Sequence, residues 1–514
     1  MLLPRSVTEL RADDERVTRM LRGGELRLRE RLADKQVEGR FIMRADQVHQ
    51  GVRVFGGDIA RQISGGQTVS VFGTLYEDIT IDTRPLIGEP AARATVETLT
   101  GVALGPARPA ELVVLPLPSG AYALTWRVRA ATAADIHEFF VDASTGEVVF
   151  DYSDLQTQNA VGRATGVLGD AKKISAQSAS GGFNLTDGLR PPSIRTYDMK
   201  GDPARVMNVV NGLGSLAASD LAADTDNVWT DGAVADAHVY TGLTYDYYFR
   251  RYGRKGLNDA NVSMRMLVHP VRLADHAIYG VIYPTLYANA FYAGGGYMVY
   301  GEGLPANVTS GGRTWNRVAG ALDIVAHETT HGVTDYTSNL IYLNESGALN
   351  ESFSDIMGTA VEFYYQQPGD GLLRADYLCG EDIARGVAAG ANNGIRSLAN
   401  PIAYGHPDHY SIRFRGTSDN GGVHTNSGIS NHAFYLAIEG GTNRISGVTV
   451  QGVGAASREQ VERVFYRAFT QLLTANSTFA MARVATIQAA RDLYGAGSSP
   501  ERAITEAWTA VGVN

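Results

Sequence analysis

Two histidines four residues apart place the strongest constraint on how this chain can fold. The segment ALDIVAHETTHGVTDY contains His327 and His331 among helix-compatible residues, with Glu328 directly after the first histidine. An α-helix turns once every 3.6 residues, so both imidazoles project from one face and can share a metal ion. Catalytic zinc sites take histidine nitrogens, add a third protein ligand and leave one position open. The segment therefore predicts a helix that supplies two metal ligands.

A second segment contains a suitable third ligand. In NESGALNESFSDIMGTAVEF, Glu351 stands in another helix-compatible run, and Asp355 follows one turn later on the same face. The first carboxylate can complete a zinc site, while the second can orient a histidine ligand. Glu328 lies beside the metal rather than pointing at it, which suits a general base. The pattern H-E-x-x-H also occurs by chance, but the second segment makes a zinc centre the better interpretation.

Length and composition are those of a folded protein with several domains. The chain has 514 residues, of which 44% are hydrophobic and 19% are charged. This length exceeds the size at which a single core stops growing, so two or three domains are expected. The formal net charge of -9 argues against nucleic acid as a partner, because phosphate binding needs a basic face.

The chain offers no disulfide and no visible membrane or export segment. Cys379 is its single cysteine, so packing and metal ions must hold the framework. The first residues, MLLPRSVTEL, contain no apolar core of signal-peptide length. No later stretch approaches the roughly 18 apolar residues of a membrane span, so no membrane partner is expected.

Changes in residue pattern indicate the domain organisation. Residues 7–36 are charged and helix-favouring, which predicts one or two surface helices, whereas residues 41–152 contain alternating, strand-like runs. A polar stretch at 153–159 predicts an exposed linker and a domain boundary. Mixed strands and helices follow, and the last part is largely helical. We therefore expect a front domain at 1–159, a mixed lobe at 160–340 and a helical lobe at 341–514.

A long resemblance supports the zinc interpretation. The segment HETTHGVTDYTSNLIYLNESGALNESFSDIMG is similar, almost position for position, to the active-site region of thermolysin-like neutral zinc metalloproteases. The resemblance implies one catalytic zinc ion, with protein ligands at His327, His331 and Glu351. It implies a catalytic base at Glu328 and a donor to the tetrahedral intermediate at Tyr342. Two further positions match side chains that hold the ligands in place: Asn350 and Asp355.

Three other segments match the same family. In DNGGVHTNSG, the resemblance makes His424 an oxyanion donor that is oriented by Asp419. In NNGIRSLANP, Arg396 is implied to hold the substrate carbonyl, and in YANAFY a strand edge at Asn289 and Ala290 is implied to pair with the peptide backbone. The pocket for a bulky apolar residue after the scissile bond matches Val318, Ile324, Cys379, Ile383 and Ile395. From the sequence alone, these apolar residues are equally compatible with core packing.

Acidic residues near the motif match a structural calcium site of the family. The implied ligands are Asp323, Glu362, Asp376 and Glu381, with Leu378 contributing its carbonyl oxygen. Hard oxygen ligands drawn from several segments suit calcium. Leu378 stands where an acidic side chain would help to hold a second ion, so we expect one calcium ion.

The front segment is similar to the pro-region of these proteases, on the residues MRADQVHQGVRVFGGDI, TWRVRA and DASTGEVVFDY. The resemblance implies a zymogen, whose pro-region assists folding, inhibits the cleft of its own chain and is removed by self-processing near Asn159 and Ala160. It also implies an α+β fold, with small α+β modules followed by a two-lobed zincin catalytic unit. The first lobe would be mainly β and the second mainly α, with the metal helix at the base of the cleft.

The resemblance implies zinc-dependent hydrolysis of peptide bonds on the amino-terminal side of bulky hydrophobic residues, by a secreted monomer. Glu328 would activate water and pass the proton to the leaving amine, while Tyr342 and His424 would stabilise the oxyanion. Two alternatives stay open here. An inert binding module would keep its pro-region bound, but the complete catalytic set argues against it. An aminopeptidase could share the zinc motif, but the calcium carboxylates and the DNGGVH segment argue against it.

Overall fold

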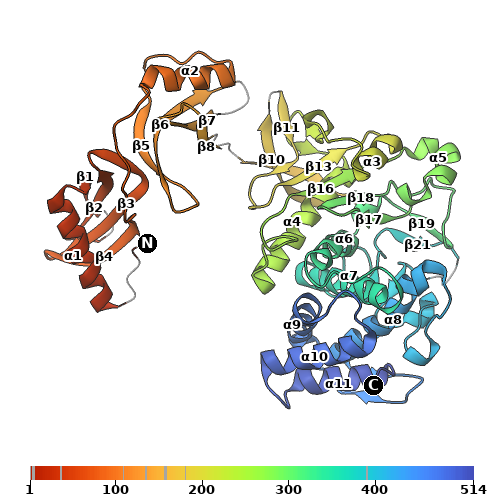
Figure 1. Cartoon of the computed structure of the whole chain (residues 1–514). Coiled ribbons are helices and arrows are strands. Elements are labelled where there is room, and N and C mark those ends of the chain that lie inside the picture. The colour runs from red at the N-terminus through yellow and green to blue at the C-terminus, as the bar shows by residue number, and fades with distance from the viewer. Residues whose placement is uncertain are drawn as a thin grey trace. The chain divides into compact units, whose positions relative to one another are not determined.

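The computed structural model describes residues 2, 6–34, 37–107, 109–132, 136–154, 159–179, 181–388 and 392–514. The chain divides into two compact units, Met1–Gln156 and Thr157–Asn514 (Figure 1). Each unit has its own sheets and hydrophobic clusters, and each is described by itself. Within these residues, no helix is long and apolar enough to cross a membrane.

The first unit combines a large antiparallel-rich sheet with two helices. Its strands follow the order β1-β2-β3-β5-β6-β7-β8, and β4 pairs with β3. The strands are β1 Leu26–Ala33, β2 Arg40–His49, β3 Val52–Ser64, β4 Gln67–Thr74, β5 Glu111–Pro116, β6 Tyr122–Ala131, β7 Ile136–Asp142 and β8 Val148–Ser153. Helix α1 (Val7–Gly23) contacts β1 and β4, and helix α2 (Glu89–Thr100) contacts β6 and β7. The strand-rich pattern expected for residues 41–152 is therefore present.

The prediction of helix for residues 7–36 is wrong in its second half. Helix α1 ends at Gly23, and Gly24 adopts a left-handed conformation with φ 76, which glycine tolerates best. The chain then forms β1, which pairs antiparallel with β2 and buries Leu26. Pairing with a distant strand thus overrides the helix propensity of a charged segment, which is a weak signal by itself.

The second unit begins with two five-stranded sheets, ordered β14-β11-β10-β9-β15 and β12-β13-β16-β18-β17. The strands are β9 Asn159–Thr165, β10 Ala171–Ala179, β11 Gly182–Asn184, β12 Thr186–Asp187, β13 Ile194–Asp198, β14 Ala223–Asp224, β15 Val228–Trp229, β16 Met264–Val268, β17 Ala290–Tyr292 and β18 Tyr297–Tyr300. Strand β17 pairs only with β18 among the described strands, so it forms an edge with one side of its backbone unpaired.

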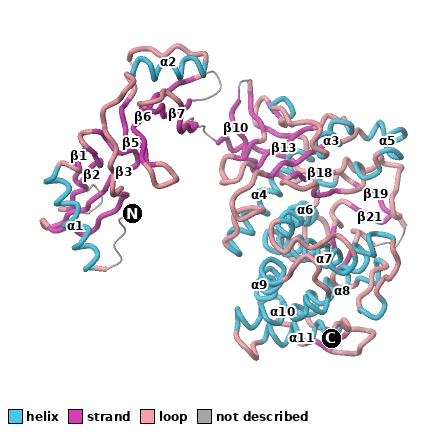
Figure 2. Tube along the Cα trace, viewed as in Figure 1, coloured by secondary structure: helices cyan, strands magenta, loops and turns pink. Residues whose placement is uncertain are grey.

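Helices make up most of the remainder, as Figure 2 shows for the C-terminal half. They are α3 Pro203–Val210, α4 Gly232–Tyr252, α5 His276–Ile282, α6 Leu322–Asp335, α7 Asn344–Tyr365, α8 Ser418–Glu439, α9 Arg458–Arg467, α10 Phe479–Tyr494 and α11 Ser499–Ala510. Short strands pair as β19 Arg313–Trp315 with β21 Ala384–Gly386, β20 Leu378–Cys379 with β22 Arg396–Ser397, and β23 Gly441–Thr442 with β24 Thr449–Val450. The mixed α+β class is confirmed.

Helix α4 fastens the metal-motif helix α6 to the rest of the unit. The hydroxyl of Tyr248 lies 2.7 Å from Oγ1 of Thr330 in the middle of α6, and both groups are buried. The hydroxyl of Tyr247 donates to Oε2 of Glu462 in α9 at 3.0 Å, also within the core. A buried polar pair specifies one arrangement of the elements that carry it. These two bonds therefore connect the strand-rich half of the unit to α6 and to the helical half.

An ion network holds the start of α4 against the sheet. Nε2 of His269 lies 2.8 Å from Oδ2 of Asp231, which caps α4, and its Nδ1 lies 2.7 Å from Oε2 of Glu302. Arg317 donates from Nε to Oε1 of the same glutamate at 2.8 Å. Burial lowers the pKa of His269, but hydrogen bonds to the two carboxylates outweigh this effect and raise the pKa to about 10. The imidazole is therefore held in its charged form at neutral pH.

The network predicts a pH-dependent contribution to stability. An unfolded histidine has a pKa of about 6.5, so the contribution is complete below that pH and is lost as the pH rises through about 10. His269→Asn tolerates the left-handed backbone at this position (φ 51) but removes the imidazolium. At about pH 6 it should lower the free energy of unfolding by on the order of 2 kcal/mol. Denaturant unfolding should show this difference shrinking toward about pH 10, and a constant difference would contradict the charged network.

Candidate active site

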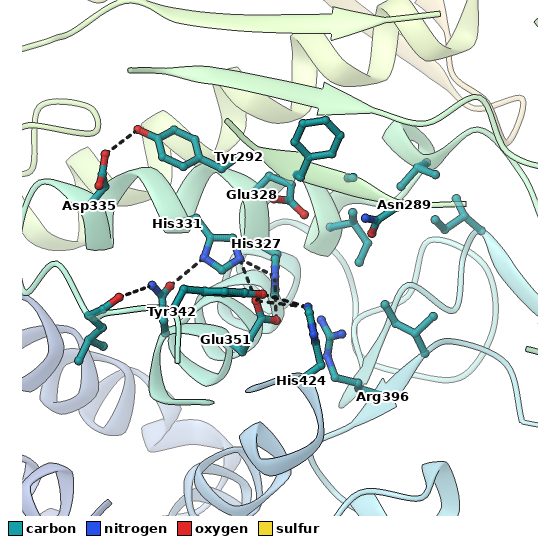
Figure 3. Close-up of a pocket in the computed structure, with 18 of the residues that line it drawn as sticks. Asn289, Tyr292, His327, Glu328, His331, Asp335, Tyr342, Glu351, Arg396 and His424 are labelled. Atoms are coloured by element: carbon teal, nitrogen blue, oxygen red, sulfur yellow. Dashed lines mark hydrogen bonds and ion pairs between the residues drawn. The ribbon is translucent and has the colours of Figure 1, made fainter. Parts of the chain in front are cut away.

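The structure brings together the three residues predicted to bind zinc. Nε2 of His327 faces Nε2 of His331 at 3.0 Å. The carboxylate oxygens of Glu351, from α7, lie 3.6 Å and 3.4 Å from these two nitrogens. Figure 3 shows the three side chains converging on one point. One ligand atom from each residue lies within 4.8 Å of the others, which is the spacing of a metal site.

The chemistry of this donor set fits zinc. Burial alone would raise the pKa of Glu351, but the imidazoles of His331 and His327 hold it well below its usual range, so the carboxylate is ionised. Its Oε2 atom is buried and accepts no hydrogen bond from the described residues. Two imidazole nitrogens and one carboxylate oxygen form a common ligand set of catalytic zinc, with a fourth position left open. These residues therefore suit one catalytic zinc ion.

The second nitrogen of each histidine is held by a further side chain. Nδ1 of His327 lies 2.9 Å from Oδ1 of Asp355, and Nδ1 of His331 lies 2.8 Å from Oδ1 of Asn350. Such contacts place a proton on Nδ1 and leave Nε2 available to a metal. Burial lowers the pKa of His331, but the hydrogen bond and charge of Glu351 outweigh it and raise the pKa to about 9. A cation between these groups would take the place of that proton.

Asp355 is the centre of a buried hydrogen-bond network. It accepts hydrogen bonds from Nε and Nη2 of Arg396 at 2.8 Å and 2.7 Å, and from Nδ2 of Asn431 at 2.8 Å. Burial would raise its pKa, but Arg396 and His327 hold the pKa below the usual range. Arg396 comes from β22 and Asn431 from α8, so one carboxylate connects α6, α7, β22 and α8.

Two predicted oxyanion donors stand beside the zinc ligands. The hydroxyl of Tyr342 donates to Oε1 of Glu351 and lies 3.0 Å from Nε2 of His424. Burial and the charge of Glu351 raise the pKa of Tyr342 far above neutrality, so its proton remains available for donation. Nδ1 of His424 lies 2.6 Å from Oδ1 of Asp419, which turns Nε2 toward the zinc ligands. Both donors therefore point at the same side of the cavity (Figure 3).

A left-handed turn places His424 in this position. Positive φ values of 53, 49, 84 and 82 occur in succession at Asp419, Asn420, Gly421 and Gly422. A Cβ atom on Gly421 would stand 2.1 Å from Oδ1 of Asn344, so this position has room for glycine alone. The turn brings Oδ2 of Asp419 within 3.0 Å of the backbone nitrogen of His424. The acid therefore holds both the ring and the backbone of the histidine.

A cavity of about 540 Å³ contains these side chains. Glu328 lines it and lies beside the zinc ligands on α6 (Figure 3). Seven residues predicted to bind substrate also line it: Asn289, Ala290, Val318, Ile324, Ile383, Ile395 and Arg396. Cys379 is not among the lining residues, because its side chain is buried in the main core cluster. Of the predicted apolar pocket, the aliphatic residues thus line the cavity and the cysteine does not.

Several cavity residues were missed in the sequence: Phe291, Tyr292, Trp315, Asp335, Asn339, Leu340 and Ile341. Three of them carried a usable signal. Phe291 and Tyr292 directly follow the predicted strand edge and extend it as β17. Asp335 follows His327 and His331 at the same four-residue interval, so helical spacing alone places it on the metal-binding face of α6. The remaining positions lie in loops or come from distant strands, which spacing does not reveal.

The acidic residues predicted to bind calcium form a separate cluster. Glu362, Glu381 and Asp382 place one oxygen each within 4.8 Å of the others, and Asp323 and Asp376 add their charges to the group. Burial and the repulsion from Asp323 raise the pKa of Glu381 to about 10 and that of Glu362 well above its usual range. Neither glutamate side chain has a hydrogen-bond partner among the described residues. Such buried carboxylates suit a divalent cation with oxygen ligands.

Leu378 was predicted for this acidic cluster, whereas Asp382 was not. Leu378 lies in β20, and its amide donates to Oδ1 of Asp376 at 2.6 Å, which keeps its backbone beside an acid of the cluster. Asp382 was not predicted, although it directly follows Glu381, and it contributes an oxygen to the set. The close set therefore contains two of the four predicted carboxylates, Glu362 and Glu381, together with Asp382, whereas Asp323 and Asp376 act on it through their charges.

Comparison with known proteins matches both halves of the second unit. A family model described as thermolysin metallopeptidase, catalytic domain, matches residues 161–335, and one described as thermolysin metallopeptidase, alpha-helical domain, matches residues 338–513. Thermolysin from Bacillus sp. (strain EA1) is 37% identical over 533 residues, which covers 98% of this chain and 89% of that protein. Bacillolysin from Bacillus cereus is 43% identical over 359 residues, covering 69% of this chain and 55% of that protein.

Among solved structures, the chain is similar to the precursor of protealysin, a metalloproteinase from Serratia proteamaculans. The TM-score is 0.48 and the sequence identity 28%, with 64% of this chain and 90% of that chain covered. The family assignment rests on the two family models and on the relatives that align along the chain. On these matches, the chain belongs to the thermolysin family of zinc-dependent metallopeptidases and is a metalloendopeptidase.

Proposed function

We propose that this chain is a zymogen whose second unit cuts peptide bonds on the amino-terminal side of bulky hydrophobic residues. The observation that carries the proposal is the convergence of His327, His331 and Glu351 in a cavity with an aliphatic wall. The family relationship supports zinc as the ion that these residues hold.

The roles of the surrounding residues follow from their positions. Zinc, when bound, supplies a Lewis acid that polarises the scissile carbonyl and makes water more acidic. Glu328 takes a proton from the attacking water and passes it to the leaving amine. The hydroxyl of Tyr342 and Nε2 of His424 lie 3.0 Å apart, so both can donate to one developing oxyanion. Asp419 keeps the His424 ring in that orientation.

The proposed specificity rests on the wall and the edge of the cavity. The aliphatic side chains of Val318, Ile324 and Ile383 form a cluster with the partly buried Ile395. A bulky apolar side chain placed there gains about 25 cal/mol for each Å² removed from water. Arg396 is held by Asp355 at the cavity wall, where it can donate to a substrate carbonyl. The unpaired edge of β17 can add an extended peptide as a further strand.

Calcium is proposed as a structural ion for the second acidic cluster. Its ligands would be the side chains of Asp323, Glu362, Asp376 and Glu381 with the carbonyl oxygen of Leu378, and Asp382 would be an addition to the predicted set. Burial and mutual repulsion favour a cation at this place, because they make ionised carboxylates costly on their own. One ion suffices for a set of this size.

The first unit is proposed to be the pro-region. It would assist folding, inhibit the cleft of its own chain, and leave after cleavage near Asn159 and Ala160. A division into two compact units close to residues 156–157 supports a removable front part. The proposed cleavage point coincides with the first residues of β9. Export of a monomeric enzyme is proposed with it, from the family resemblance.

A first test separates metal binding from catalysis. Glu328→Gln should bind zinc as well as the parent but reduce kcat by roughly 10²- to 10⁴-fold, because it removes a general base and no ligand. Zinc content, together with cleavage of a peptide carrying Leu after the scissile bond, measures both effects. In the parent, a chelator should abolish activity and added zinc should restore it. Zinc binding without any cleavage by the processed parent would favour the inert binding module instead.

A second test addresses calcium. Saturating calcium should raise the Tm of the zinc-loaded Glu328→Gln protein, since an ion at about 100 times its Kd adds about 2.7 kcal/mol. Glu381→Gln in the same background should lose this increase. Without calcium it should melt close to its parent, because burial already keeps the Glu381 carboxyl protonated, with a pKa of about 10. Thermal unfolding with magnesium in place of calcium is the control, and a Tm indifferent to calcium would refute the site.

A third test concerns maturation. The active parent should begin near Ala160, whereas purified Glu328→Gln should remain full-length because it cannot process itself. Adding a trace of active parent to that variant shows whether the junction is open to cleavage by another molecule. Terminal sequencing and mass measurement give the result, and an active form that retains its Met1 start would disprove the zymogen proposal.

A further inference from the structure

Asp335 is a charged cavity residue that the proposed reaction does not use. It is the last residue of α6 and lies one turn beyond His331 on the same helix face. Figure 3 shows Asp335 and Tyr292 on one side of the zinc ligands and Asn289 and Arg396 on the other. A carboxylate therefore stands at the end of the cavity remote from the substrate-carbonyl arginine.

This carboxylate is held in place by a hydroxyl group and not by a cationic side chain. The hydroxyl of Tyr292 donates to Oδ2 of Asp335 at 3.2 Å. Burial raises the pKa of Tyr292, and the charge of Asp335 adds to the effect, so the hydroxyl stays protonated as a donor. In the part of the chain that the structure describes, no Lys, Arg or His side chain forms an ion pair with Asp335. The side chain is exposed, so a group from outside can reach it.

Helix stability does not explain an acid at this position. The last turn of an α-helix carries partial negative charge on its unpaired carbonyl groups, so it favours cations and disfavours carboxylates. Asp335 closes α6 against that preference, where its charge and the helix dipole add to the same negative potential. The two together attract a positive group more strongly than an isolated surface aspartate would.

The direction of strand β17 indicates which residues of a bound peptide lie near the negative potential at Asp335. The aliphatic pocket for the residue after the scissile bond includes Ile324 and packs against Ala290 at the start of β17. Tyr292 ends the strand on the other side of the zinc ligands (Figure 3). A peptide lying along the edge therefore carries the residues before the scissile bond toward Tyr292 and Asp335. Because a strand advances about 3.3 Å per residue, the first two of them fall within this stretch.

We infer that Asp335 selects substrates with a lysine or arginine at one of the two positions before the scissile bond. This inference rests on the proposed function and adds a charge requirement to its apolar one. The Tyr292 hydroxyl orients the carboxylate, and the Tyr292 ring offers a face against which a guanidinium can stack. Arginine is favoured over lysine, since its planar fork can bind the carboxylate through two nitrogens.

The test compares peptides that share Leu after the scissile bond and carry Arg, Gln or Glu at each of the two preceding positions in turn. In the processed parent, kcat/KM for the better Arg peptide should exceed that for its Gln counterpart by about 5- to 10-fold. Asp335→Asn should bring this ratio to about one, and Asp335→Lys should shift the preference to Glu. Asp226→Asn, which changes an exposed carboxylate elsewhere on the unit, should leave the ratio at the parent value.

The salt dependence of the Arg-to-Gln preference tests the inference on the parent enzyme, without a variant. Raising the ionic strength from about 0.05 M to about 0.5 M should shrink the Arg-to-Gln ratio of the parent, because an exposed charge pair is screened. Equal cleavage of Arg and Gln peptides by the parent would overturn the inference while leaving the proposed function intact. If the processed parent cuts none of the peptides, both the proposed function and the inference fall.

Discussion

The arrangement of the active site depends on one buried carboxylate. Asp355 touches Nδ1 of His327, both donating nitrogens of Arg396 and the amide of Asn431. A charge taken out of water is tolerated only when partners of this kind surround it, so the carboxylate can stay buried only if all of these elements are in place. Asp355 thereby fixes three parts of the site at once. They are the zinc ligand His327, the strand that carries Arg396 and the helix that begins with the turn before His424.

The residues that could be predicted from the sequence are those whose relation is local. The four-residue interval between His327 and His331 places both side chains on one face of a helix. This follows from helix geometry alone, without knowledge of the fold. Continuing that interval would have reached Asp335, which was overlooked because the motif ends one turn earlier. Glu351 and Asp355 could be suggested from their place one turn apart in a second helical run, and the resemblance supported that suggestion, but nothing in their spacing shows that α7 packs against α6.

The features that could not be predicted depend on partners far away in the chain. Residues 26–33 look like helix until β2 pairs with them. The hydroxyl of Tyr247 finds Glu462 across 215 positions of sequence, and the two residues carry no pattern that links them. Cys379 resembles a pocket residue, but its side chain points into the core. In each case tertiary packing decides between two locally acceptable states.

The left-handed turn at 419–422 affects how sequence variation in this enzyme should be interpreted. Gly421 performs no chemistry, yet any side chain there would collide with Asn344 and displace the histidine three positions later. A survey of single substitutions would therefore show Gly421 to be as intolerant as the groups that handle protons. Along this segment, intolerance to replacement reports the shape of the backbone, and only a change that preserves this shape can reveal which side chains react.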